Sequence, residues 1–150
     1  MSARPDVACG EDIEQLADLL GLLFAQEADF APDAQKQRRA LREILADESI
    51  GRVYVAREAG RVVGMCSLLY TVSTAEGGKA AWFEDLVVRP ESRGRGIGRM
   101  LLEHAIEQAR AEGVLRITLL SDADNVRAHA LYRKLGFSDS PMRTMRLRLR

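Results

Sequence analysis

A stretch rich in glycine and arginine, residues 93–98 with the sequence RGRGIG, is the part of this chain best suited to bind an anion. It lies where a predicted strand ends and a predicted helix begins, and there unpaired main-chain N–H groups and the helix dipole favour negative charge. Glycine lets phosphate oxygens approach the main chain, because no Cβ atom is in the way. Positive charge is added by Arg89, Arg93, Arg95 and Arg99. We predict a diphosphate-binding loop; the alternative is a turn that only connects strand to helix.

Two common nucleotide-binding motifs do not fit this loop. Arg99 stands where the GxGxxG motif needs its last glycine, and no GK[ST] sequence ends the loop. The sequence therefore favours neither a Rossmann-type dinucleotide nor a P-loop nucleotide.

A second candidate site follows one predicted strand later, at Asn125, Ala128 and Tyr132. Spacings of three and four place the three residues within about 60° of one helix face, so one ligand could contact all of them. The Tyr132 phenol, with an ordinary pKa of about 10, is suited to donate a proton to a leaving thiolate. The alternative is that Asn125 caps the helix and Tyr132 is a packed aromatic residue.

Two adjacent carboxylates interrupt the apolar strand WFEDLVV at residues 82–88. Strand alternation predicts two faces, one with Glu84, Leu86 and Val88 and the other with Phe83, Asp85 and Val87. A carboxylate in a sheet is costly unless it is paired or lies in a wet cleft. One of the two should therefore face a functional cleft, and for Asp85 an ion pair with an arginine is the alternative.

These residues need a framework of alternating helices and strands. The periodicity predicts helices at about 11–25, 33–47, 97–111 and 126–135, and strands at 6–9, 52–58, 61–74, 81–88 and 115–121. A final strand is predicted in the tail, where Met145, Leu147 and Leu149 alternate with arginines. We expect one α/β domain over residues 1–150, with about four helices around a mixed, mainly antiparallel sheet.

Composition excludes several classes of protein. The 150 residues carry 22 basic and 22 acidic side chains, so no net charge attracts nucleic acid or an anionic membrane. The apolar runs are far shorter than a membrane span, and no signal sequence is recognisable, so we expect a cytoplasmic protein. Cys9 and Cys66 are far apart and outside any CxxC pattern, which indicates neither a metal site nor a disulfide framework.

The two candidate sites together resemble the GNAT superfamily of N-acetyltransferases. Arg93, Gly96 and Gly98 match its [QR]xxGx[GA] signature, and residues 125–137 match its NxxAxxxYxxxGF block. The resemblance implies the GNAT fold and acetyl-CoA as cosubstrate, with no metal. The residues that it implies for binding acetyl-CoA are Leu86, Val87 and Val88 of the strand, Arg93, Arg95, Gly96, Ile97, Gly98 and Arg99 of the loop, and Asn125 and Ala128.

The pair Glu84–Asp85, followed by three apolar residues, an arginine and a proline, resembles the polyamine acetyltransferase branch. That resemblance implies Glu84 as general base, directly or through water, and Tyr132 as general acid. Leu120 occupies the place where ribosomal-protein N-terminal acetyltransferases carry a catalytic glutamate, which disfavours that branch.

The acceptor is predicted to be a primary amine, either a small amine or a polyamine-like molecule. Loops over the cleft vary most freely, so residues 27–33 and 74–80 should set specificity, and Glu27, Asp29 and Asp85 could attract a cationic amine. The alternatives are a protein lysine or N-terminal acetyltransferase and a non-catalytic acyl-CoA binding module. A homodimer is also expected, because the edge of the arginine-rich final strand needs a cover.

Overall fold

The computed structural model describes residues 2–27 and 30–150. The chain divides into two compact units, Met1–Leu120 and Ser121–Arg150. Among the described residues, no helix has both the length and the apolar character needed to cross a membrane.

The first unit is built on a five-stranded sheet in the order β1-β2-β3-β4-β5. Its strands are β1 (Arg4–Val7), β2 (Gly51–Glu58), β3 (Arg61–Ser73), β4 (Gly78–Val88) and β5 (Ile117–Leu119). The first three pairings are antiparallel, and β5 runs parallel to β4. The predicted mixed, mainly antiparallel sheet is therefore confirmed, although β5 is shorter than the seven residues predicted.

Tight turns join the long antiparallel strands. β2 and β3 meet at Ala59 and Gly60, and both residues have positive φ, 51° and 78°. Such a two-residue turn matches the twist of the strands that it joins. The glycine predicted to make this turn is confirmed, and Ala59 shares the left-handed conformation.

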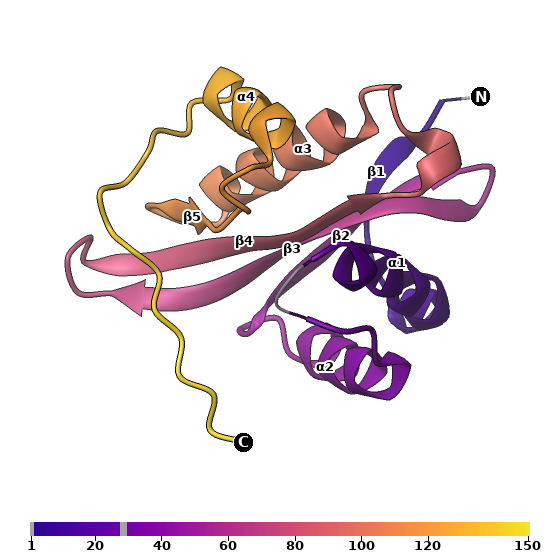
Figure 1. Ribbon diagram of the computed structural model, residues 1–150, viewed down its shortest axis with the longest axis horizontal. Coiled ribbons are helices and arrows are strands. Elements are labelled where there is room, and N and C mark those ends of the chain that lie inside the picture. Colours follow the sequence, from indigo (N-terminus) through magenta and orange to yellow (C-terminus); the bar gives the residue numbers. More distant parts are fainter. Residues whose placement is uncertain (1, 28–29) are drawn as a thin grey trace. The chain divides into compact units, whose positions relative to one another are not determined.

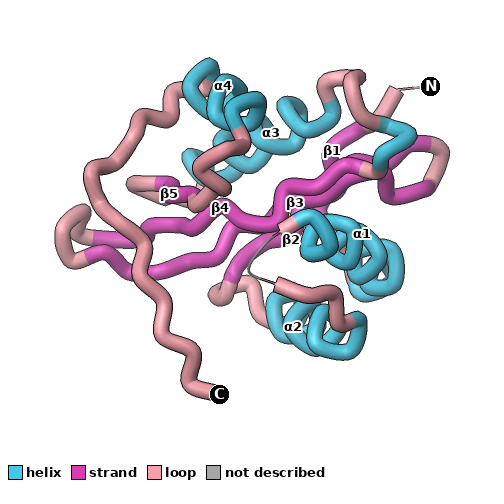
Figure 2. Tube along the Cα trace, viewed as in Figure 1, coloured by secondary structure: helices cyan, strands magenta, loops and turns pink. Residues whose placement is uncertain are grey.

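Helices cover both faces of the sheet (Figure 1). α1 (Ile13–Gln26), which follows a short 3₁₀ turn at Gly10–Asp12, and α2 (Ala34–Ala46) lie on one face, and α3 (Ile97–Ala111) lies on the other. Figure 2 shows the same layers coloured by secondary structure. All three helices begin and end within about three residues of the predicted bounds, because each carries a clear apolar stripe.

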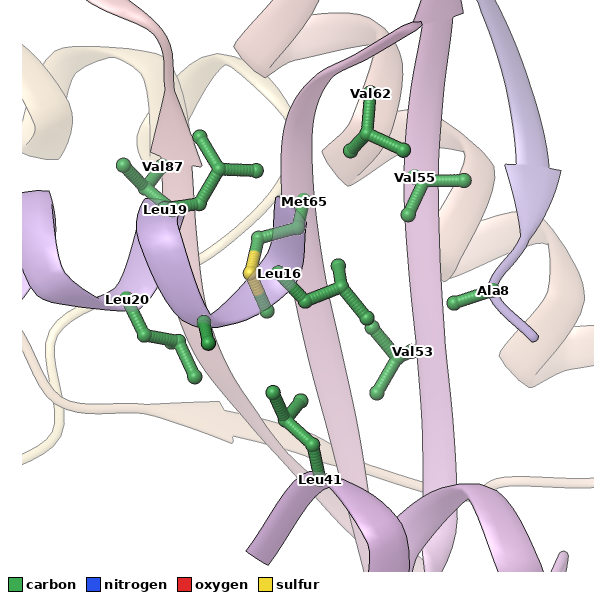
Figure 3. Close-up of a cluster of buried hydrophobic side chains, with 11 residues drawn as sticks. Ala8, Leu16, Leu19, Leu20, Leu41, Val53, Val55, Val62, Met65 and Val87 are labelled. Atoms are coloured by element: carbon green, nitrogen blue, oxygen red, sulfur yellow. The ribbon is translucent and has the colours of Figure 1, made fainter. Parts of the chain in front are cut away.

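The core under α1 is close-packed and apolar (Figure 3). Leu16 and Leu19 of α1 are fully buried, and Leu41 of α2 packs into the same cluster. The sheet contributes Val53, Val55, Val62, Met65 and Val87. Met65 and Val87 therefore identify the face of the sheet that α1 covers, which matters for the orientation of the carboxylates of β4.

A buried amide fixes α2 against α1. Gln37 donates from Nε2 to the carbonyl oxygen of Ala17 at 2.8 Å and accepts at Oε1 from the N–H of Asp33 at 2.8 Å. Asp33 also caps α2, because its Oδ1 accepts from the N–H of Lys36 at 3.2 Å. These hydrogen bonds hold the start of α2 and tie this helix to the middle of α1.

The second unit holds one helix and the tail. α4 (Val126–Lys134) is followed by Gly136 at a φ of 101°. The predicted final strand is wrong: residues 142–150 form no strand, and Met142, Met145, Leu147 and Leu149 are 83–93% exposed. Alternation alone does not make a strand, because its main-chain groups also need a neighbouring strand as hydrogen-bond partner.

Candidate active site

The parallel pairing of β4 with β5 stops in the middle of β4. Three residues of each strand are paired, Ala81–Phe83 with Ile117–Leu119, and β4 then continues alone on that side to Val88. In the described part of the chain, no strand pairs with residues 84–88 on the β5 side. Main-chain groups on that side of residues 84–88 are therefore available to a ligand that enters between the two strands, except for the Val88 carbonyl oxygen, which accepts from Arg93 Nε at 3.0 Å.

A β-bulge lies at the same point of β4. Glu84 pairs with Ser67 and Val87 with Met65, so residues 85 and 86 together oppose the single residue Cys66 of β3. Asp85 has a φ of 59°, in the left-handed region that side chains other than glycine rarely adopt. Such strain persists only where the surrounding structure imposes it, and it concentrates at functional sites.

The bulge corrects the predicted faces of β4. Ser67 and Met65 are two residues apart on β3, so their partners Glu84 and Val87 share one face, whereas simple alternation had separated them. This is the face that α1 covers further along the strand, because Met65 and Val87 belong to the cluster under α1. Glu84 itself is exposed, beyond the part of the sheet that the core covers.

Three carboxylates converge at the bulge. The pKa of Asp85 is raised to about 7, mainly by burial and then by the charges of Glu84 and Glu27, against a lowering by the hydroxyl of Ser67. Ser67 donates this hydrogen bond to Oδ2 of Asp85 at 3.4 Å. Partial burial also raises the pKa of Glu84. Such groups hold and release protons nearer to neutral pH than ordinary carboxylates do.

Among the described residues, no arginine forms an ion pair with Asp85, so the arginine partner considered from the sequence is not found. Glu27, at the end of α1, lies close enough for its charge to act on Asp85, as its predicted role in the same site requires. The third predicted acceptor residue, Asp29, lies outside the described residues.

The glycine loop forms an open main-chain cradle at the start of α3. Gly94 and Gly96 have φ values of 77° and 81°, and no atom lies within 4 Å of the position that a Cβ atom would take at either residue. Gly96 is the N-cap of α3. The first helical turn leaves the N–H groups of Ile97, Gly98 and Arg99 without acceptors inside the helix. These donors suit a diphosphate, so the loop fits the pyrophosphate of acetyl-CoA.

The arginines of this loop form ion pairs or hydrogen bonds with other groups of the protein. Arg99 pairs with Glu103 at 2.6 Å, Arg95 pairs with Glu58, and Arg93 donates from Nε to the carbonyl oxygen of Val88 at 3.0 Å. Part of the positive charge expected from the sequence is thus compensated. The main-chain N–H groups of the loop are therefore the donors that the structure leaves for an anion, and they stay a predicted binding site.

The second unit carries the remaining candidate residues on α4. Asn125 caps the helix, because its Oδ1 accepts from the N–H of Ala128 at 3.3 Å. Tyr132 packs against Phe137 with ring centroids 5.9 Å apart, and burial raises the pKa of its phenol. Asn125 is thus a helix cap and Tyr132 is a packed aromatic residue, as the structural alternatives predicted. These roles do not conflict with a catalytic one, since a raised pKa keeps the phenol protonated and able to donate.

Sequence reasoning missed the bulge and the hydroxyl of Ser67. Ser67 is 1% exposed and is a polar residue inside the apolar run 62–69 of β3, which is the one signal that could have drawn attention to it. The sequence of β4 does not indicate the bulge, because Glu84 and Val87, which flank it, would fit a regular strand equally well. In the described ranges, no cluster of His, Cys, Asp and Glu could hold a metal ion.

A sheet that separates beside a bulge, with an anion-binding loop at the start of the next helix, defines an acyl-CoA-dependent transferase of the α/β class. The chain belongs to the acetyltransferase (GNAT) family, whose sequence model matches residues 15–137. The predicted family, fold, enzyme class and acetyl-CoA cosubstrate are thereby confirmed.

Individual relatives support the same family. An "IAA acetyltransferase" of Azospirillum brasilense is 38% identical over 85% of this chain and 74% of its own length. A glucosamine 6-phosphate N-acetyltransferase of Trypanosoma brucei brucei is 35% identical over 67% of this chain and 66% of its own length. A solved putative acetyltransferase from Agrobacterium tumefaciens superposes with a TM-score of 0.81 at 26% identity, covering 97% of this chain and 99% of the other. The two named acceptors differ, so the family fixes the reaction but not the amine.

Proposed function

We propose that this protein transfers an acetyl group from acetyl-CoA directly to a small primary amine, with Glu84 as general base and Tyr132 as general acid. The observation that carries the proposal is the position of Glu84, an exposed carboxylate with a raised pKa at the point where β4 leaves β5. Acetyl-CoA supplies the activated acetyl group as a thioester.

The side chains of Glu84 and Tyr132 carry out the two proton transfers of the reaction. The amine nitrogen forms the new bond to the acetyl carbon, and Glu84 accepts the proton that this nitrogen loses, directly or through water. The carbon–sulfur bond breaks, and the phenol of Tyr132 donates its proton to the departing sulfur. The raised pKa values of both groups support these roles, because Glu84 becomes a stronger base and Tyr132 stays protonated.

Cosubstrate binding rests mainly on the main chain. We assign the pyrophosphate to the N–H groups of the loop 93–99, and the pantetheine arm to main-chain groups of Leu86, Val87 and Val88 on the side of β4 where β5 no longer pairs. For Asn125 and Ala128 of α4, contact with acetyl-CoA stays a prediction from the resemblance. Glu27 and Asp85 attract the cationic acceptor, and Asp29 stays a prediction with the same role.

The experiment that tests the proposal follows thiol release from acetyl-CoA with a panel of primary amines. Replacing Glu84→Gln or Tyr132→Phe should lower kcat by about 10²- to 10⁴-fold, the usual contribution of a general acid or base, while acetyl-CoA still binds.

The controls are Glu107→Gln, an exposed glutamate of α3, and Tyr70→Phe, a phenol on β3 that donates to Glu112. Both should keep the kcat of the unchanged chain. Full turnover in the Glu84 and Tyr132 variants would refute the assigned roles, and acetyl-CoA binding without turnover in the unchanged chain would favour a non-catalytic acyl-CoA binder.

A further inference from the structure

The side chain of Trp82 on β4 is exposed to solvent, whereas the residues before and after it are buried. Its side chain is 37% exposed, whereas Ala81 and Phe83 on either side are 2% and 3% exposed. An indole ring is a large apolar group, and leaving it in water forgoes the gain from burying it. It is therefore a candidate contact surface for a ligand.

The strand register places Trp82 beside the catalytic carboxylate. Trp82 pairs with Leu69 and Glu84 with Ser67, and since Leu69 and Ser67 are two residues apart on β3, Trp82 and Glu84 lie on one face. Neighbouring positions on one face of a strand are about 7 Å apart. The indole is thus within reach of a small molecule whose amine lies at Glu84.

Apolar and charged groups occupy different ends of this face. The carboxylates gather at and after Glu84, where Asp85 and Glu27 lie close together. Around Trp82 the paired residues are the half-buried Leu69 of β3 and Thr118 of β5, neither of which is charged. The core under α1 includes Val87 on this face but not Trp82.

We propose that the acceptor is a primary amine joined by a short spacer to an apolar ring, with the ring packed on Trp82 and Leu69. The proposal rests on the function proposed above and names its substrate class. A spacer of about two or three carbon atoms spans the separation between neighbouring positions on the face. A polyamine fits less well, because its second ammonium group would lie beside Leu69 and gain only the weak attraction of an exposed aromatic ring.

The first test uses fluorescence, because Trp82 is the single tryptophan of the chain. Titration of the protein, saturated with CoA, with 2-phenylethylamine should change the tryptophan emission in a saturable way. Propylamine, which has the amine but no ring, and spermidine should change it much less at equal concentration. Equal responses to all three amines would overturn the proposal without any need for turnover.

The second test compares steady-state kinetics of Trp82→Ala and Trp82→Phe. The alanine variant should raise KM for 2-phenylethylamine about tenfold, as expected for the loss of a ring contact, with KM for acetyl-CoA and for propylamine unchanged. Phenylalanine should restore most of the loss, because it keeps an aromatic ring. Thermal midpoints of both variants show whether they are folded.

The outcomes separate this proposal from the one on which it rests. Thiol release with propylamine and spermidine, but without preference for 2-phenylethylamine, overturns the ring-bearing acceptor and leaves the acetyltransferase reaction in place. An equal loss for all amines in Trp82→Ala also overturns it. Absence of release with every amine overturns both.

Discussion

Asp85 combines two costs in one residue, a left-handed backbone and a carboxyl group that burial keeps from ionising freely. The sequence indicates that a carboxylate in this apolar strand needs a reason, and the resemblance to the polyamine acetyltransferase branch singles out Glu84 as the base. The sequence could not indicate the bulge, because the conformation of Asp85 follows from the pairing of β4 with β3 and not from neighbours in the chain. The same pairing brings Ser67 to Asp85, a contact between residues 18 apart.

Replacing Asp85→Asn should stabilise the fold at neutral pH. The folded state holds the proton of Asp85 up to a pKa of about 7, above the ordinary value of 3.8, so this carboxyl costs stability as pH rises from about 4 to 7. The shift sets a ceiling of roughly 4 kcal/mol, at about 1.4 kcal/mol per pKa unit. We expect a gain of about 1 to 3 kcal/mol at pH 8, because the amide is still a polar group in a partly buried place.

Denaturant unfolding at pH 5 and pH 8 measures this gain. The difference in unfolding free energy between the two pH values should shrink in Asp85→Asn and stay unchanged in Asp122→Asn, which replaces an exposed carboxylate of the second unit. A gain of the same size at both pH values would show that strain or packing, and not ionisation, is responsible.

Among the elements, the helices and the glycine loop were predictable, and the short strands were not. Residues 93–98 carry their conformation in their own types, since glycine is the residue that adopts positive φ readily, and both Gly94 and Gly96 do so. β5 and the tail depend on partners that a local pattern does not specify. β5 is therefore only three residues long, and residues 142–150 form no strand.

At the scale of this loop, Gly96→Ala should weaken acetyl-CoA binding. Space is available for the methyl group, but a φ of 81° is unfavourable for alanine by about 1 kcal/mol or more, so the loop is expected to move its N–H groups away from the anion. We expect a five- to tenfold rise in Kd for acetyl-CoA, measured by calorimetry; about 1.4 kcal/mol corresponds to tenfold.

Gly98→Ala is the matched control. Its φ is not in the left-handed region, and the added methyl would lie 3.9 Å from Cγ2 of Val88, an ordinary contact. Its Kd should stay within about twofold of the unchanged chain, well below a tenfold effect. Equal weakening in both variants would mean that the added methyl groups, and not backbone conformation, disturb the cosubstrate.

At the scale of the whole molecule, the tail is the largest departure from what the sequence predicted. Met142, Met145, Leu147 and Leu149 are apolar residues that stay 83–93% exposed, and from residue 145 to residue 150 apolar residues alternate with arginines. Burying one such leucine is worth about 1.5 to 3 kcal/mol, so the exposed tail retains a substantial driving force for association. The homodimer expected from the sequence, which stays a prediction, would use this segment.

The dimer can be tested by changing only apolar residues of the tail. If a second copy covers it, the unchanged chain should form a dimer in size-exclusion chromatography with light scattering, and the double variant Leu147→Glu, Leu149→Glu should be monomeric. The control Arg150→Gln changes one of the alternating arginines and should stay dimeric. A monomer for the unchanged chain over a wide concentration range would exclude the dimer. Retention of the dimer in the glutamate variant would instead place the contact on another surface, because two charged carboxylates cannot be buried in an apolar interface without large cost.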